Sequence, residues 1–125
     1  MRPEAHLRLA RPSRDLAAAE RFWVEGLGLS VLWRLSEGHD LLMLGWPAAT
    51  WHLELVHDPA VAPSPTEEDQ LVLYADGPVP AADLARLLAA GGRRVGSRNP
   101  YWEEHGVTVE DPDGYRLVLS TRAWP

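Results

Sequence analysis

Hydrophobic and polar residues alternate along a series of short stretches of this chain, a pattern typical of half-buried β-strands. These stretches are residues 6–11, 29–35, 41–45, 50–57, 70–75, 93–98, 106–110 and 115–121. In the two remaining periodic segments the apolar residues recur every three to four positions, which predicts amphipathic helices. The first helix is expected to begin at Asp15 and end near Gly26, and the second to cover about residues 81–90.

The order of these elements repeats along the chain. A strand, a helix and three strands are followed by a proline-rich connector at about residues 58–68, and then by the same series again. We therefore predict one α+β domain over residues 1–125, built from two βαβββ modules. Module one covers about residues 1–60 and module two about residues 69–125.

The repeat indicates where a ligand would bind. Each predicted helix can cover only one face of its small sheet, so the other face must pack against something or line a cavity. Two such modules side by side would curl their uncovered faces into a shared cleft, the natural position for a ligand site.

Composition excludes several classes of protein. The chain has no cysteine, so disulfides, thiolate zinc sites and cysteine nucleophiles are absent. The formal charge of −6 argues against a nucleic-acid partner or an acidic membrane surface. Hydrophobic residues make up 46% of the chain, yet they form neither a signal peptide nor a bilayer-spanning run. We expect a cytoplasmic protein with a normal core and no membrane partner.

The stretch WHLELVH, residues 51–57, contains residue types that bind metals. If it is a strand, His52, Glu54 and Val56 share one face, and Leu53 and Leu55 point the other way. This strand alone can therefore supply only two ligands, and any metal site needs partners from elsewhere in the chain.

Three motifs in order resemble those of the vicinal oxygen chelate superfamily, which includes glyoxalase I, bleomycin-resistance proteins, fosfomycin-resistance enzymes and extradiol dioxygenases. The motifs are Asp15-Leu16 followed by Phe22-Trp23 and Gly26-Leu27-Gly28-Leu29, then His52-Leu53-Glu54-Leu55, and finally Glu110-Asp111-Pro112-Asp113-Gly114-Tyr115. The stretches NPYWEEHG and EDPDGYRLVL resemble a YycE-like subgroup of the superfamily. The DPDG sequence is also a good hairpin turn in its own right, because Pro112 presets the turn and Gly114 can adopt a positive φ.

The resemblance implies four metal-ligand positions, which fall on Arg8, Glu54, Gln70 and Val118. Arginine has no lone pair to give and valine cannot ligate, so we expect no metal cofactor. A two-residue shift in the first strand would instead place His6 in the cleft. His6, His52 and Glu54 could then form a facial triad for a divalent ion such as Zn, Ni, Fe or Mn.

Without a metal, Arg8 and Glu54 are expected to meet in the cleft, either as a buried ion pair or as ligand-binding groups. Glu54 or His52 could then serve as a catalytic general base. Other candidate ligand-binding residues are Gln70 and Tyr74 on the fifth strand, and Tyr101 and Trp102 on a connector that could act as an aromatic lid. For Tyr74, Tyr101 and Trp102, packing is the alternative role. His39, His57 and His105 are expected at the surface.

The sequence leaves three functions open. The first is a glyoxalase/bleomycin-resistance-like protein that binds a small organic molecule without metal. The second is a divalent-metal-dependent lyase, isomerase or dioxygenase. The third is a dimeric scaffold with a vestigial cleft. In each case we expect a homodimer, because the fold leaves strand edges and aromatic surface exposed.

Overall fold

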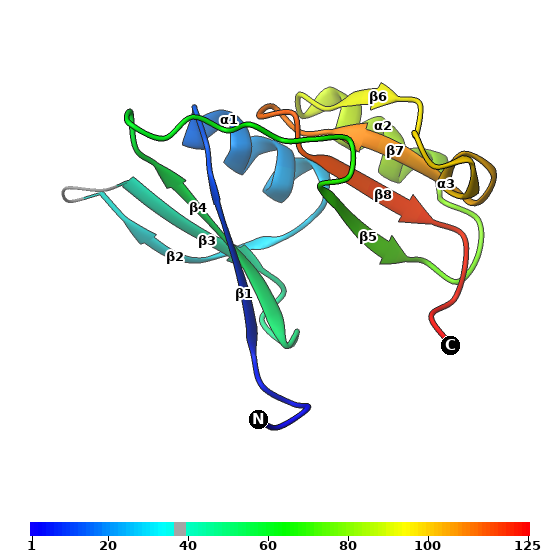
Figure 1. Ribbon diagram of the computed structural model, residues 1–125, viewed down its shortest axis with the longest axis horizontal. Helices are drawn as coiled ribbons and strands as arrows, with labels where there is room; N and C mark the ends of the chain where they lie inside the picture. Colours follow the sequence, from blue (N-terminus) through cyan, green and yellow to red (C-terminus); the bar gives the residue numbers. More distant parts are fainter. Residues whose placement is uncertain (37–39) are drawn as a thin grey trace.

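The computed structural model describes residues 1–36 and 40–125 and has two four-stranded mixed sheets (Figure 1). In the first sheet the strand order is β1-β4-β3-β2, and in the second it is β5-β8-β7-β6. Each sheet has one parallel pair, β1 with β4 and β5 with β8, while the other neighbours are antiparallel. The predicted α+β architecture of two βαβββ modules is confirmed.

The first module contains β1 (Leu7–Pro12), β2 (Ser30–Leu35), β3 (Asp40–Gly45) and β4 (Trp51–His57). The second contains β5 (Gln70–Tyr74), β6 (Arg93–Val95), β7 (Gly106–Glu110) and β8 (Arg116–Ser120). The strands lie where alternation predicted them, although β6 stops at Val95 and not at Arg98. In the parallel β1–β4 pair, Arg8 lies opposite His52 and Ala10 opposite Glu54, and the pairing continues to Pro12 without a shift.

Helix α1 (Leu16–Glu20) continues into a π-helical segment, η1 (Arg21–Gly26). It begins at Asp15, whose side chain accepts a hydrogen bond from the backbone N–H of Ala18, as expected of an N-cap. In the second module, α2 (Ala81–Ala89) is the predicted helix.

A third helix was not predicted from the sequence. Helix α3 (Pro100–His105) lies in the segment that we expected to be a loop. Asn99 caps it by accepting a hydrogen bond from the N–H of Tyr101, and Pro100 occupies the first turn, where a missing N–H costs nothing.

Both modules contribute to one hydrophobic core. Its members come from both helices and both sheets, namely Ala19, Phe22, Trp23, Leu29, Leu42, Leu44, Leu53, Leu55, Leu87, Val109, Leu117 and Leu119. Gly92 allows the modules to approach closely, since an added Cβ would lie 2.8 Å from Phe22 Cε2 and 2.7 Å from the carbonyl oxygen of Leu87. Leu53 and Leu117 point into this core. Because successive side chains of a strand point to opposite faces of the sheet, Glu54 and Arg116 point away from the core.

The DPDG segment forms the predicted turn, with Gly114 at a φ of +91°. Asp111 Oδ1 accepts the N–H groups of Asp113 and Tyr115 inside the turn, both at 2.9 Å. The turn also joins the modules, which sequence analysis did not predict. Asp113 accepts the backbone N–H of Arg14 at 2.9 Å, and the Arg11 guanidinium lies 4.3 Å from the ring centroid of Tyr115.

Within the described ranges, none of the helices is long and apolar enough to span a bilayer.

Candidate functional site

The polar residues of WHLELVH lie on the face of the first sheet that points away from the core. We call this face, with Arg8, His52 and Glu54 at its centre, the first open face. Arg8 comes from β1 and the other two from β4, and the register pairs Arg8 directly with His52. Because residues opposite each other across a sheet point to the same side, the fold brings these three side chains together.

Arg8 and Glu54 meet as expected. Arg8 Nη1 lies 3.3 Å from Glu54 Oε1, within hydrogen-bond distance. The pair is not fully buried, however, because the Arg8 side chain is 55% exposed and that of Glu54 is 11% exposed. The alternative of a buried structural ion pair is therefore wrong for the guanidinium. Glu54 accepts a hydrogen bond from Nη1 of Arg8. The other N–H groups of the Arg8 guanidinium can therefore donate to an incoming anionic group.

His52 forms the second polar contact of this face. Its Nδ1 lies 2.7 Å from Nε2 of His6, just before β1 begins, so His6 reaches the site without any register shift. Burial lowers the pKa of His52 below its ordinary value, and the neighbouring His6 and Arg8 lower it further. His52 is therefore a neutral imidazole at pH 7. Its Nε2 is buried and lacks a hydrogen-bond partner among the described residues.

These donors do not fit a divalent metal as they are arranged. The imidazoles of His6 and His52 bond to each other at 2.7 Å, which occupies one nitrogen of each ring, and the Glu54 carboxylate contacts a guanidinium. In residues 1–36 and 40–125, no group of three or more His, Cys, Asp or Glu side chains is placed to hold a metal ion. The His6–His52–Glu54 triad is thus not assembled as a ligand set.

The apolar part of the first open face extends toward β2. Met43 lies opposite Glu54, and Trp33 lies opposite Met43 with 60% of its surface exposed. Gly45 makes room beside the imidazole, because an added Cβ would lie only 3.1 Å from His52 Cβ. The face therefore has a charged end at β1 and an apolar end at β2.

Gln70 and Tyr74 do not join this group. They lie on β5 in the other sheet, where Gln70 Nε2 donates to the carbonyl of Glu67 at 3.2 Å. The two modules do enclose a cavity of about 220 Å³, but its lining is apolar apart from His52. The lining includes Leu7, Leu9, Trp23, Leu27, Trp51, Leu53, Leu71, Val72, Leu73 and Leu117. The polar residues expected in a shared cleft lie elsewhere.

An aromatic cluster occupies one end of the second sheet. The ring of Tyr74 lies 6.1 Å from Trp102 and 5.4 Å from Trp124, and Tyr101 lies 4.9 Å from Trp102. Tyr101 and Trp102, proposed as a lid, thus belong to helix α3. Trp102 packs against Tyr74, and Tyr101 packs against Trp102. Trp124 near the C-terminus was not predicted, because a lone tryptophan outside periodic elements gives no sequence signal.

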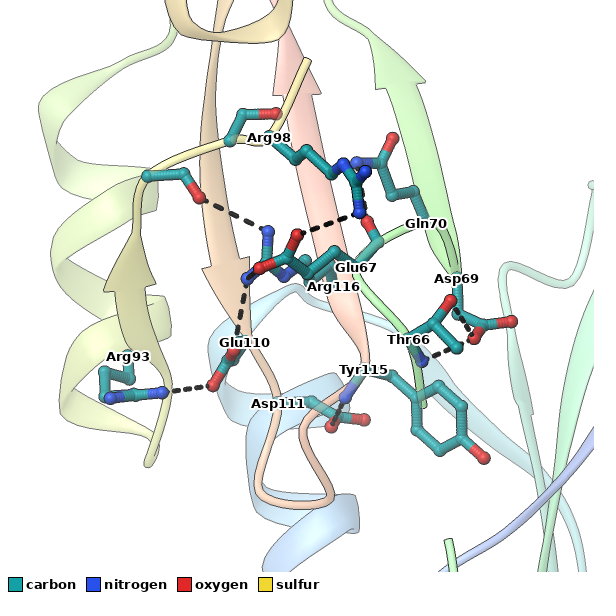
Figure 2. Close-up of polar contacts among 12 residues, drawn as sticks. Thr66, Glu67, Asp69, Gln70, Arg93, Arg98, Glu110, Asp111, Tyr115 and Arg116 are labelled. Atoms are coloured by element: carbon teal, nitrogen blue, oxygen red, sulfur yellow. Dashed lines mark hydrogen bonds and ion pairs between the residues drawn. The ribbon is translucent and has the colours of Figure 1, made fainter. Parts of the chain in front are cut away.

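Figure 2 shows a second polar group that sequence reasoning missed, centred on Arg116. Arg116 lies on the face of β8 that points away from the shared core, together with Glu110 of β7. This face is covered, because Arg116 is 9% exposed and Val118 is fully buried. The Arg116 guanidinium donates to the carbonyl of Gly96 at 3.3 Å. Alternation could have revealed this residue, since Arg116 precedes the buried Leu117 and must point away from it.

The remaining histidines have local roles. His57 contacts the carbonyl oxygen of Ser13 through Nδ1 at 2.9 Å, and His105 lies 3.7 Å from Glu104, so neither joins the polar group around Arg8 or the one around Arg116. His39, also expected at the surface, lies outside the described residues.

Comparison with known proteins agrees with this architecture. Residues 7–56 match the YycE-like N-terminal domain and residues 68–121 match the YycE-like C-terminal domain. The uncharacterised protein YycE of Bacillus subtilis is 41% identical over 120 residues, covering 92% of this chain and 86% of that protein. The crystal structure of a YycE protein of unknown function from Bacillus subtilis has a TM-score of 0.88 at 38% identity, covering 98% of this chain and 93% of that one.

A more distant structure is that of TnmS3, an antibiotic binding protein from Streptomyces sp. CB03234. Its TM-score is 0.66 at 28% identity, and the match covers 95% of each chain. The family matches together span both modules, and the neighbours share the paired βαβββ fold. The chain therefore belongs to the YycE-like family of the vicinal oxygen chelate superfamily.

Proposed function

We propose that this protein binds a small organic molecule on the first open face, without a metal ion. The observation that carries the proposal is the arrangement of Arg8, whose half-exposed guanidinium is held at one side by Glu54. A guanidinium fixed in this way can hold a carboxylate or phosphonate group through two parallel hydrogen bonds. The ligand would therefore carry an anionic group.

The shape of the face indicates the rest of the ligand. From Arg8, the side chains change from charged to apolar across the sheet, ending at Met43 and the largely exposed Trp33. An indole with that exposure offers a surface on which a flat or apolar body can stack. We thus expect an amphipathic molecule, with its anionic group at β1 and its apolar part at β2. The relationship to an antibiotic binding protein supports a sequestering role.

Proton transfer is a second candidate function. His52 is neutral at pH 7 because its pKa is lowered, and its buried Nε2 has no partner among the described residues. A neutral imidazole beside a bound anion could act as a general base. In that case the protein would be a metal-independent isomerase or lyase.

The protein would act as a homodimer. Strands β1 and β5 are edge strands of their sheets, and Leu7 of β1 is 65% exposed beside the apolar cavity between the modules. Unpaired edges with exposed apolar side chains favour association. A second copy of the chain packed over β1 and the apolar cavity would remove the strand edge and the exposed Leu7 from water. Arg8 would then lie next to the dimer interface.

Thermal stability in the presence of matched ligands tests the binding proposal. Phenylphosphonate and benzoate carry an anionic group on an apolar ring, and benzyl alcohol is a neutral control. A ligand that binds only the folded protein raises its Tm by mass action. We expect both anions to raise the Tm, and Arg8→Gln to abolish the effect. Arg86→Gln, on the surface of α2, is the matched control and should respond as the parent does.

Absence of any response to the anions would contradict the proposal, as would an equal response in Arg8→Gln. The catalytic alternative is tested separately by His52→Gln. If His52 acts as a base, deuterium exchange into a bound ligand that carries an acidic C–H, followed by NMR, should be lost in this variant.

A further inference from the structure

The apolar cavity between the two modules has room for a small molecule. Its volume is about 220 Å³, and its lining includes Leu7 and Leu9 of β1 and residues 71–73 of β5, the edge strands of the two sheets. An apolar cavity of about 150 Å³ is large enough to hold benzene. The cavity can therefore accept a six-membered ring that carries a small substituent.

One residue of the lining has a buried hydrogen-bond donor without a partner. Trp23 is 1% exposed, and its Nε1 has no hydrogen-bond partner among residues 1–36 and 40–125. An indole N–H can only donate, and burying it without an acceptor is unfavourable. A water molecule would need two or more polar partners, and His52 is the one other polar side chain among the described residues that line the cavity.

The indole of Trp23 is held in place by its surroundings. Its ring lies 4.9 Å from that of Phe22, at an interplanar angle of 88°. Both residues belong to η1, where the helix changes from α to π geometry. Turns of π-helix frequently occur at functional sites. The donor is thus fixed at the cavity before any ligand enters, which lowers the entropic cost of binding.

His52 connects this cavity to the first open face. Its Nδ1 contacts His6, while its buried Nε2 has no partner in the described part of the chain. Nε2 is a donor or an acceptor according to which imidazole donates in the contact with His6, so the group that the ligand must carry follows from Trp23. The described side chains around the cavity include no Asp, Glu, Lys or Arg, so a charged ligand would be costly to bury.

We propose that the cavity between the modules is a second ligand site, which binds a small neutral molecule through a carbonyl oxygen that accepts the indole N–H of Trp23. The apolar body of this molecule would pack against the leucines of β1 and β5. The site does not use Arg8, and so it stands apart from the anion binding proposed for the first open face. A second copy of the chain packed over β1 would close the cavity from water.

The test uses the full chain with Arg8→Gln, so that the first open face lacks its arginine and the two proposals can fail separately. Cyclohexanone is the probe. Methylenecyclohexane, which has a CH₂ group in place of the oxygen, is the matched control ligand. We expect saturable binding of cyclohexanone by calorimetry, about fivefold tighter than that of methylenecyclohexane because of one additional hydrogen bond. In NMR spectra of ¹⁵N-tryptophan-labelled protein, cyclohexanone should shift the indole N–H signal of Trp23.

Trp23→Phe assigns that signal and tests the hydrogen bond. The variant keeps an aromatic ring but has no donor, so it should bind the two probes with equal affinity. A general loosening of the cavity would change both affinities together, and the ratio of the two therefore reports on the hydrogen bond alone.

Leu9→Phe keeps the experiment decisive even if Trp23→Phe fails to fold. Leu9 lines the cavity and is 37% exposed, so a larger side chain there can occupy the cavity without disrupting the core. Cyclohexanone binding should weaken by about tenfold or more, because the probe can no longer be buried. Leu88→Phe, at a position of α2 that is 40% exposed, is the matched control and should bind as its Arg8→Gln parent does.

Four results would overturn the proposal. They are no saturable binding of cyclohexanone, equal affinity of the parent for both probes, binding that leaves the Trp23 signal unmoved, and equal affinities of Leu9→Phe and Leu88→Phe. The first of these is also the result expected if side chains of a second copy already fill the cavity.

Discussion

Arg8 Nη1 lies 3.3 Å from Oε1 of Glu54, and the two side chains differ sharply in exposure, at 55% and 11%. The carboxylate is nearly buried while the guanidinium that neutralises it is largely in water. Such a pair is a poor source of stability, because water screens one partner. It is well suited to ligand binding, because the charge of Arg8 is kept available at the surface of the sheet.

A double-mutant cycle on this pair tests that distinction. We expect Arg8→Met to reduce the free energy of unfolding by about 1 kcal/mol, since the guanidinium is more than half exposed. Glu54→Leu should be close to neutral, and the coupling energy should be below about 1 kcal/mol. Urea denaturation of the parent, both single variants and the double variant measures these terms. A coupling energy in the range typical of fully buried pairs, about 3–5 kcal/mol, would show that the pair is structural.

The metal content of the purified protein is a second prediction. Arg8, Gln70 and Val118 occupy three of the four ligand positions that the family resemblance implies, and His6 and His52 bond to each other. We expect far less than one equivalent of zinc, nickel, iron or manganese per chain. Elemental analysis after purification without metal-affinity resin gives the answer, and EDTA should leave the Tm unchanged. About one equivalent that EDTA removes would favour the metal-dependent alternative.

The oligomeric state is a third prediction. We expect a dimer by light scattering at micromolar concentration, held in part by Leu7 and Leu9 at the exposed β1 edge. Leu7→Glu should shift the protein to a monomer, because a carboxylate would be buried at the interface. Leu88→Glu, on an exposed position of α2, is the control and should remain dimeric. A parent protein that is monomeric at these concentrations would contradict the prediction.

The parts of the fold that followed from sequence are those with strong local signals. Alternation located β4, and with it the shared direction of His52 and Glu54, because one face of that strand is buried in the core. Helix α3 was missed because six residues are too few to show helical periodicity. Its capping residue Asn99 and the following proline fit either a turn or the start of a helix.

The candidate site was harder to predict, because it depends on which sheet faces meet. Gln70 and Arg8 lie in different modules, and sequence cannot tell whether their faces converge within one chain. The apolar faces of both sheets share one core, so the polar faces point elsewhere. Arg116 was not predicted as a site residue. The family resemblance implies a site residue at Val118 instead, two positions further along the same strand face.

A fourth prediction concerns the pH dependence of stability. Burial raises the pKa of Asp111 to about 6, although two backbone N–H groups at 2.9 Å favour the ionised form. The folded protein thus binds this proton more tightly than the unfolded chain, whose aspartates titrate near 3.8. The contribution of Asp111 to stability is therefore largest below pH 3.8 and falls as the pH rises toward and past 6.

Asp111→Asn removes this titration while keeping an oxygen to accept both N–H groups. Relative to the parent, the variant should gain stability as the pH rises from 4 to 7, by about 2–3 kcal/mol at most. Unfolding free energies measured at several pH values give the difference directly. Asp83→Asn, on the surface of α2, should show no such trend. A difference between Asp111→Asn and the parent that stays constant with pH would disprove the prediction.

The last prediction concerns Gly92, which lies at a close contact between the two modules. A Cβ at this position would lie 2.7 Å from the carbonyl oxygen of Leu87 and 2.8 Å from both Phe22 Cε2 and Val109 Cγ1. Phe22 belongs to the first module and the other two to the second, and all three are buried, so the core cannot move aside cheaply. Gly92→Ala should therefore reduce the free energy of unfolding by about 1–3 kcal/mol, as overpacking does elsewhere. Gly96→Ala is the control, since its nearest contact is a flexible Glu103 oxygen at 3.5 Å, and it should change stability by less than about 0.5 kcal/mol. Chemical denaturation of both variants makes the comparison, and equal stabilities would mean that the modules are not packed as closely as this contact requires.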